Sequence, residues 1–158
     1  MAASAGLTPT AVRLVWAITV LSVAHHVDHL LRDVTGWPVE DEVNPFTISL
    51  LVYPMIAVAL FLSRRGRFGP RSWAALAGGG ALFILAVHVG PVAGDSVTRI
   101  PLQYDSALAA VAALVVLVAF FCALVAHCLY ELRTAAQRLD AAGPDETGAR
   151  TPSGSLRG

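Results

Sequence analysis

Three histidines and one aspartate lie in a single short stretch, SVAHHVDHLLRD, at residues 22–33. His25 and His29 are four residues apart, so on a helix they share one face, and Asp28 lies three residues after His25. Imidazole nitrogens and carboxylate oxygens bind divalent metals, ligate haem iron and transfer protons. The stretch therefore predicts a site for metal, haem or proton chemistry.

The composition is that of a membrane protein. Of the 158 residues, 56% are hydrophobic and 14% are charged, and the mean hydropathy is +0.65. Soluble domains carry roughly 25% charged residues, so long segments of this chain lack a polar face that could contact water. Because the formal net charge is zero, no nucleic-acid partner is expected. The expected partner is the lipid bilayer.

Four apolar stretches approach the ~20 residues that cross a bilayer. They run approximately over residues 12–31, 46–62, 73–89 and 107–130. We predict an all-α fold, an integral membrane four-helix bundle running up-down-up-down within residues 1–134, followed by a disordered cytoplasmic tail over 135–158. The first stretch is longer than the apolar core of a signal peptide and ends in charged residues, so we expect it to be retained.

Arginine placement predicts the orientation. The loop between the second and third spans is arginine-rich, whereas the loop after the first span is acidic. By the positive-inside rule, the middle loop and both termini lie in the cytoplasm of a cell membrane that we expect to be bacterial. The residues concerned are Arg64, Arg65, Arg67 and Arg71 in the middle loop, and Asp33, Glu40, Asp41 and Glu42 in the first loop.

Two further features concern the second and third spans. Pro54 removes one backbone hydrogen bond, which predicts a bend in the second span. The third span contains AALAGGGA at residues 74–81, which places small residues four apart and favours close helix packing, within the chain or in a homodimer. A phosphate-binding loop would need a preceding strand and a following Lys-Ser/Thr, and the sequence has neither.

Span direction sorts the polar residues into two layers. Spans one and three run the same way and span four starts where they end, so one rim of the bundle gathers residues from all three. The predicted metal and cofactor ligands at this rim are His25, His29 and His88, Asp28 is a further predicted metal ligand, and the predicted catalytic carboxylates are Asp28 and Asp105.

Several polar residues also have a purely structural interpretation. Asp28 can pair with a snorkelling Arg32, His26 can hydrogen-bond a carbonyl group, and Asp105 can cap the fourth span. A second polar group lies ~30 Å along span four from the first cluster. It comprises His127, Cys128 and Glu131, and the sequence favours an interfacial helix end there over a site.

Three functions fit the first cluster. The preferred one is a divalent zinc, iron or copper ion whose bound water attacks a lipid-like or small amphiphilic substrate, or whose binding serves metal handling. The second is a haem b electron-transfer protein with one histidine from span one and His88 as ligands. The third is a proton or cation relay or transporter, built as a dimer.

Overall fold

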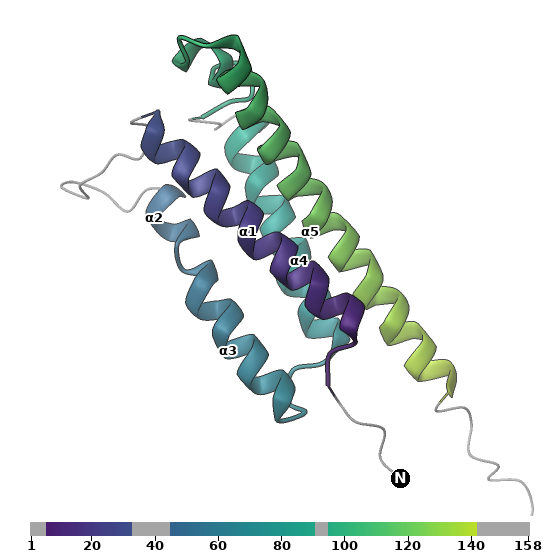
Figure 1. The fold of residues 1–158 in the computed structure, drawn as a ribbon. Coiled ribbons are helices and arrows are strands. Elements are labelled where there is room, and N and C mark those ends of the chain that lie inside the picture. The colour runs from purple at the N-terminus through teal and green to yellow at the C-terminus, as the bar shows by residue number, and fades with distance from the viewer. Residues whose placement is uncertain (1–5, 33–44, 91–94, 142–158) are drawn as a thin grey trace, which may run out of the picture.

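The structure is a computed structural model that describes residues 6–32, 45–90 and 95–141. It is all-helical over this part of the chain, and four helical segments are long and apolar enough to cross a membrane. In Figure 1, α1, α4 and α5 lie together and α3 runs beside them. The elements are α1 (Pro9–Leu31), α2 (Pro45–Ser49), α3 (Val52–Arg64), α4 (Pro70–His88), the 3-10 helix η1 (Ile100–Gln103) and α5 (Ala107–Ala141).

Helix α1 begins at an N-terminal cap that also contacts α5. The Thr8 side chain accepts a hydrogen bond from the Ala11 N–H at 3.1 Å, and Pro9 occupies the first turn, where its missing N–H costs nothing. The Thr8 hydroxyl lies 2.6 Å from the Tyr130 hydroxyl of α5. The cap therefore places the start of α1 beside α5.

The second candidate span is interrupted where its proline predicts. α2 ends at Ser49 and α3 starts at Val52, so the break lies at Leu50 and Leu51. Pro54 has no N–H for the Leu50 carbonyl and its ring crowds that carbonyl. The Tyr53 N–H bonds to the Leu50 oxygen at 3.3 Å in its place. The interruption leaves Ser49 close to α1, where it meets a histidine.

Helix α3 ends in a Schellman turn. Gly66 has φ 69°, a left-handed conformation that glycine adopts without strain. Its N–H bonds to the Ser63 oxygen at 3.0 Å, and the Arg67 N–H bonds to the Leu62 oxygen at 2.9 Å. These two bonds satisfy the last carbonyls of the helix and reverse the chain toward α4.

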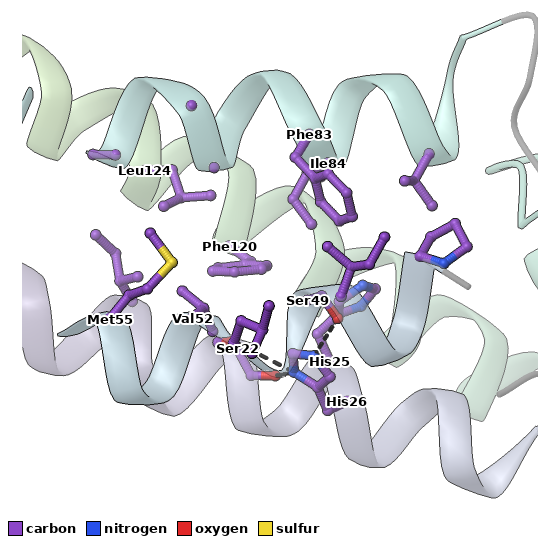
Figure 2. A pocket seen from close by; sticks show the side chains of 18 of the residues that line it. Ser22, His25, His26, Ser49, Val52, Met55, Phe83, Ile84, Phe120 and Leu124 are labelled. Atoms are coloured by element: carbon purple, nitrogen blue, oxygen red, sulfur yellow. Dashed lines mark hydrogen bonds between the residues drawn. The ribbon is translucent and has the colours of Figure 1, made fainter. Parts of the chain in front are cut away.

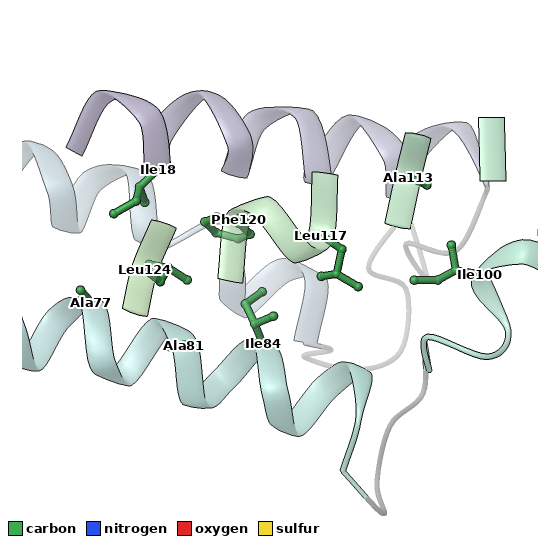
Figure 3. Close-up of a cluster of buried hydrophobic side chains, with 9 residues drawn as sticks. All are labelled: Ile18, Ala77, Ala81, Ile84, Ile100, Ala113, Leu117, Phe120 and Leu124. Atoms are coloured by element: carbon green, nitrogen blue, oxygen red, sulfur yellow. The ribbon is translucent and has the colours of Figure 1, made fainter. Parts of the chain in front are cut away.

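Small residues let α4 pack closely against α5. A Cβ added at Gly78 would lie 3.3 Å from the Cys128 sulfur, and one at Gly80 would lie 3.3 Å from Leu124. Figure 3 shows the resulting core, in which Phe120 and Leu124 of α5 lie between Ile18 of α1 and the small residues of α4. The packing expected of the glycines is confirmed within the chain, and the homodimer expected through them stays a prediction.

Large apolar side chains cover the outside of the helices. Leu108 is 80% exposed, Leu82 69% and Trp16 64%. Such a surface would aggregate in water and is what helices facing lipid present. Membrane insertion, the up-down order and the side of each terminus stay predictions.

One expectation about a span end is wrong. α5 continues to Ala141, so residues 135–141 are helical where a disordered tail was predicted, and 142–158 lie outside the described residues. Apolar and helix-favouring residues continue past Tyr130, which explains the extension. The acidic residues of the first loop, which support the predicted orientation, also lie outside the described residues; they are Asp33, Glu40, Asp41 and Glu42.

Gly78 and Gly79 lie on different faces of α4, so the same substitution at each position should have different effects on stability. Gly78→Leu forces a side chain into α5 and should cost about 1–3 kcal/mol, the usual cost of overpacking. Gly79→Leu should cost little, because a Cβ there meets nothing within 4 Å. Thermal unfolding of the purified variants in detergent measures the difference; equal melting temperatures would contradict this packing.

Candidate metal centre

Three histidines from two helices converge on one point. The Nε2 atom of His25 lies 3.1 Å from Nε2 of His29 and 3.2 Å from Nε2 of His88. One ligand atom of each lies within 4.8 Å of the others, and all three residues are buried. α1 supplies His25 and His29 one turn apart, as the i, i+4 spacing predicts, and the last residue of α4 supplies His88.

These separations match ligands of a single ion. Two nitrogens bound to zinc at about 2.0–2.1 Å and at the tetrahedral angle lie about 3.3 Å apart. Ligands on opposite sides of an ion would lie about 4 Å apart at the same bond length. The observed 3.1 and 3.2 Å therefore correspond to neighbouring coordination positions.

Hydrogen bonds to each other do not satisfy the three rings. Nδ1 of His88 lies 2.6 Å from the Asp95 carbonyl oxygen, so it is the donor and Nε2 of the neutral ring carries a lone pair. Nε2 of His25 holds at most one proton, so the neutral trio makes at most one straight N–H···N bond. Nδ1 of His25 and of His29 has no hydrogen-bond partner among the described residues.

A buried arginine with two carboxylates lies next to the histidines. Arg32 donates to Asp28 Oδ2 at 2.7 and 2.9 Å and to the two oxygens of Asp95 at 2.7 and 2.8 Å. Gln103 accepts a further bond from Arg32, and Asp28 accepts one from the Tyr104 hydroxyl. The expected pair of Asp28 with Arg32 is confirmed, but the arginine does not snorkel: its side chain is 0% exposed.

Arg32 and Asp95 stabilise each other's charge in this network. Burial opposes the charge of Arg32, but hydrogen bonds to Asp95 and Asp28 raise its pKa above the ordinary value. Burial also opposes the charge of Asp95, and Arg32 outweighs it and lowers the pKa of that carboxyl. Burial and the bond to Asp28 raise the pKa of Tyr104 to about 12. Two carboxylates and one guanidinium therefore leave one net negative charge beside the histidines.

Asp95 links this network to the histidines. Residues 95–97 lie against the end of α4, where the Val97 N–H bonds to the His88 carbonyl at 3.0 Å. Asp95 Oδ2 consequently lies 3.7 Å from His29 Nε2 and 3.7 Å from His88 Nδ1. Sequence reasoning missed Asp95; the only signal was an acidic residue in the loop that follows His88.

The other predicted residues occupy different places. Both oxygens of Asp28 are bonded, to Arg32 and Tyr104, and Asp28 is not among the converging ligand atoms. Asp105 is exposed just before α5, and its catalytic role stays a prediction. His26 points away, with Nδ1 2.7 Å from the Ser22 carbonyl and Nε2 2.7 Å from the Ser49 hydroxyl, which confirms its structural interpretation.

A large apolar cavity adjoins the three histidines. Its volume is about 850 Å³, and its lining comes from α1, α2, α3, α4 and α5. In Figure 2, His25 and Ile84 lie on opposite sides of the cavity, while Met55 and Leu124 line it further along; the His25 ring lies 5.9 Å from that of Phe120. The candidate metal centre therefore lies at one end of a space large enough for a small molecule or lipid chain.

His127, from the second polar group, lines the same cavity far from the three histidines. It is 1% exposed, its ring lies 5.7 Å from that of Trp73, and neither ring nitrogen has a hydrogen-bond partner among the described residues. Glu131, one turn later, is 2% exposed. The interfacial helix end expected here is therefore buried, as is Trp73, which donates to the Ser63 hydroxyl at 2.8 Å.

Comparison with known proteins returned no matching family model, no matching curated relative and no matching solved structure. Function is therefore inferred from the geometry of the chain itself.

Replacing Arg32 tests the charge network. Arg32→Met leaves Asp28 and Asp95 buried without a counter-charge and should cost about 3–5 kcal/mol of folding free energy. Arg32→Lys should restore only part of this, because an ammonium cannot make the forked bonds to both carboxylates. Unfolding in detergent measures the loss, with the exposed Arg99→Met as control; a stable Arg32→Met would contradict the network.

Proposed function

We propose that this chain is an integral membrane protein that binds one divalent transition-metal ion through Nε2 of His25, His29 and His88. The observation that carries the proposal is the convergence of these atoms, with separations of 3.1 and 3.2 Å from His25. Imidazole nitrogen suits zinc, copper and iron. An ion at this point would accept all three lone pairs, which hydrogen bonds among the rings cannot do.

The surroundings support an ion in two ways. The Asp95 carbonyl fixes the tautomer of His88 with Nε2 free for a metal, the usual arrangement around metal-binding histidines. The net negative charge of Asp28, Asp95 and Arg32 lowers the electrostatic cost of a cation in an apolar bundle.

Three protein ligands beside a cavity favour a catalytic type of centre. Structural zinc sites are closed by four protein ligands, whereas catalytic sites keep one position for water or substrate. The ion would supply an acidified water able to attack an ester or amide in a lipid-like or small amphiphilic substrate. Asp95, whose Oδ2 lies 3.7 Å from His29 Nε2 and which accepts from Arg32 through both oxygens, is the carboxylate beside the ligands and would stabilise the bound ion by its charge. Metal handling is the second role for the same centre.

The alternatives receive less support. A haem needs its two histidines on opposite faces of the ring, and 3.2 Å between His25 and His88 is shorter than two metal–nitrogen bonds in line. A proton relay across the bundle would need polar groups between Phe120 and His127, where Leu124 and its apolar neighbours line the cavity. We place the centre at the extracytoplasmic rim, because the arginine-rich turn after α3 belongs in the cytoplasm.

Metal analysis of the purified protein tests the proposal. The full chain in detergent should contain about one zinc, iron or copper ion and show no Soret band, as expected of a three-histidine site. His25→Ala, His29→Ala and His88→Ala should each lose the ion, because each removes one of three ligands. His26→Ala is the matched control and should keep it. Unchanged metal content in the three ligand variants would refute the proposal, and a Soret band lost in His88→Ala would favour haem.

A further inference from the structure

The cavity has a polar group at the end remote from the candidate metal centre. His127 lines it, is 1% exposed, and has no partner for either ring nitrogen among the described residues. A neutral imidazole offers one donor and one acceptor, and burying both without partners is unfavourable. The remaining lining near it is apolar and includes Leu124, Leu76 and Met55.

The dimensions of this space suit one long hydrocarbon chain. The volume of about 850 Å³ is in the range of ligand-binding cavities. Trp73, beside His127, and His88, at the candidate metal centre, are separated along α4 by about 22 Å at 1.5 Å per residue. Half of the ~30 Å hydrocarbon core, the depth that one lipid chain covers, is about 15 Å. A single chain with its polar group therefore fits along the cavity.

We propose that the cavity binds a single-chain amphiphile whose polar group hydrogen-bonds to His127 and whose hydrocarbon chain runs past Leu124 toward Phe120. The polar group both donates and accepts, as a hydroxyl does, because the imidazole presents one group of each kind. This binding site does not depend on the proposed ion, since His127 and the apolar lining lie in a different layer from the three ligands.

Substitutions at two positions should change binding without disturbing the fold. Gly79 lines the cavity and a Cβ there meets nothing within 4 Å, so Gly79→Leu fills the space without disturbing α5. His127→Phe keeps a ring of similar size and removes both polar atoms. Without ligand, His127→Phe should melt at or above the wild-type temperature, because an apolar ring replaces unpartnered polar atoms. A histidine with a merely structural role would give the opposite result.

Photolabelling with hexadecanol that carries a mid-chain diazirine tests the proposal on the full chain in detergent. Peptide mass spectrometry should place the label on cavity residues of α3, α4 or α5. His127→Phe should weaken labelling about five- to tenfold, the effect of one hydrogen bond, and His127→Gln should restore most of it. Gly79→Leu should abolish it. Ala126→Leu, an exposed neighbour of His127 outside the lining, should leave it unchanged.

Label spread evenly over the exposed helix faces, or unchanged in Gly79→Leu, would overturn the cavity as the binding site. Labelling that persists at full strength in His127→Phe would overturn the role of His127. Metal content measured on the same samples should stay at the wild-type level in every one of these variants, so failure of the amphiphile site is distinguished from failure of the metal centre.

Discussion

Three imidazole nitrogens that point at one another inside an apolar bundle constrain the rest of this structure. His25 and His29 come from one face of α1, and His88 comes from the last turn of α4. They meet because α4 and α1 both pack against α5, where Phe120 lies 5.9 Å, ring to ring, from His25 and shares a core with Ala77 and Ala81 of α4. The glycines of α4 permit that close approach. The packing of small residues in α4 therefore brings the three histidines together at one end of the bundle.

Polar groups buried in an apolar bundle are costly unless they have partners. Arg32 has five bonds to its neighbours, His26 is bonded at both nitrogens, and Trp73 is bonded to Ser63. Among the described residues, the buried side-chain atoms without a hydrogen-bond partner belong to His25, His29, His127 and Glu131. The three histidines line the same cavity, which is why the cluster of His25 and His29 is assigned a cation and His127 a polar headgroup.

The three converging histidines can be predicted from the sequence, because their positions depend on helical periodicity and on the direction of each span. The spacing of His25 and His29 determines a shared face, and counting spans places His88 at the same rim. Pro54 likewise predicts a bend in the second span, and the structure has an interruption there that begins at Leu50, one helical turn before the proline.

The remainder depends on tertiary structure that no local pattern encodes. Asp95 lies beside the histidines only because residues 95–97 lie against His88 at the end of α4. Arg32 turns inward because Asp95 supplies a second carboxylate there, a contact between residues far apart in sequence. The apolar run that ends at Tyr130 predicts an interfacial helix end at His127, but the helix continues to Ala141 and His127 is buried within the bundle. The cavity arises from the position of α3 relative to α1 and α4, which hydropathy does not report.

X-ray absorption spectroscopy of the metal-loaded protein tests the convergence of the three histidines most directly. After loading with one equivalent of zinc, the spectrum should show three imidazole nitrogens at about 2.0–2.1 Å and one oxygen ligand. The imidazole contribution should fall in His88→Ala and stay unchanged in His26→Ala. A spectrum dominated by oxygen ligands, or one that is identical in wild type and His88→Ala, would show that the three rings do not share an ion.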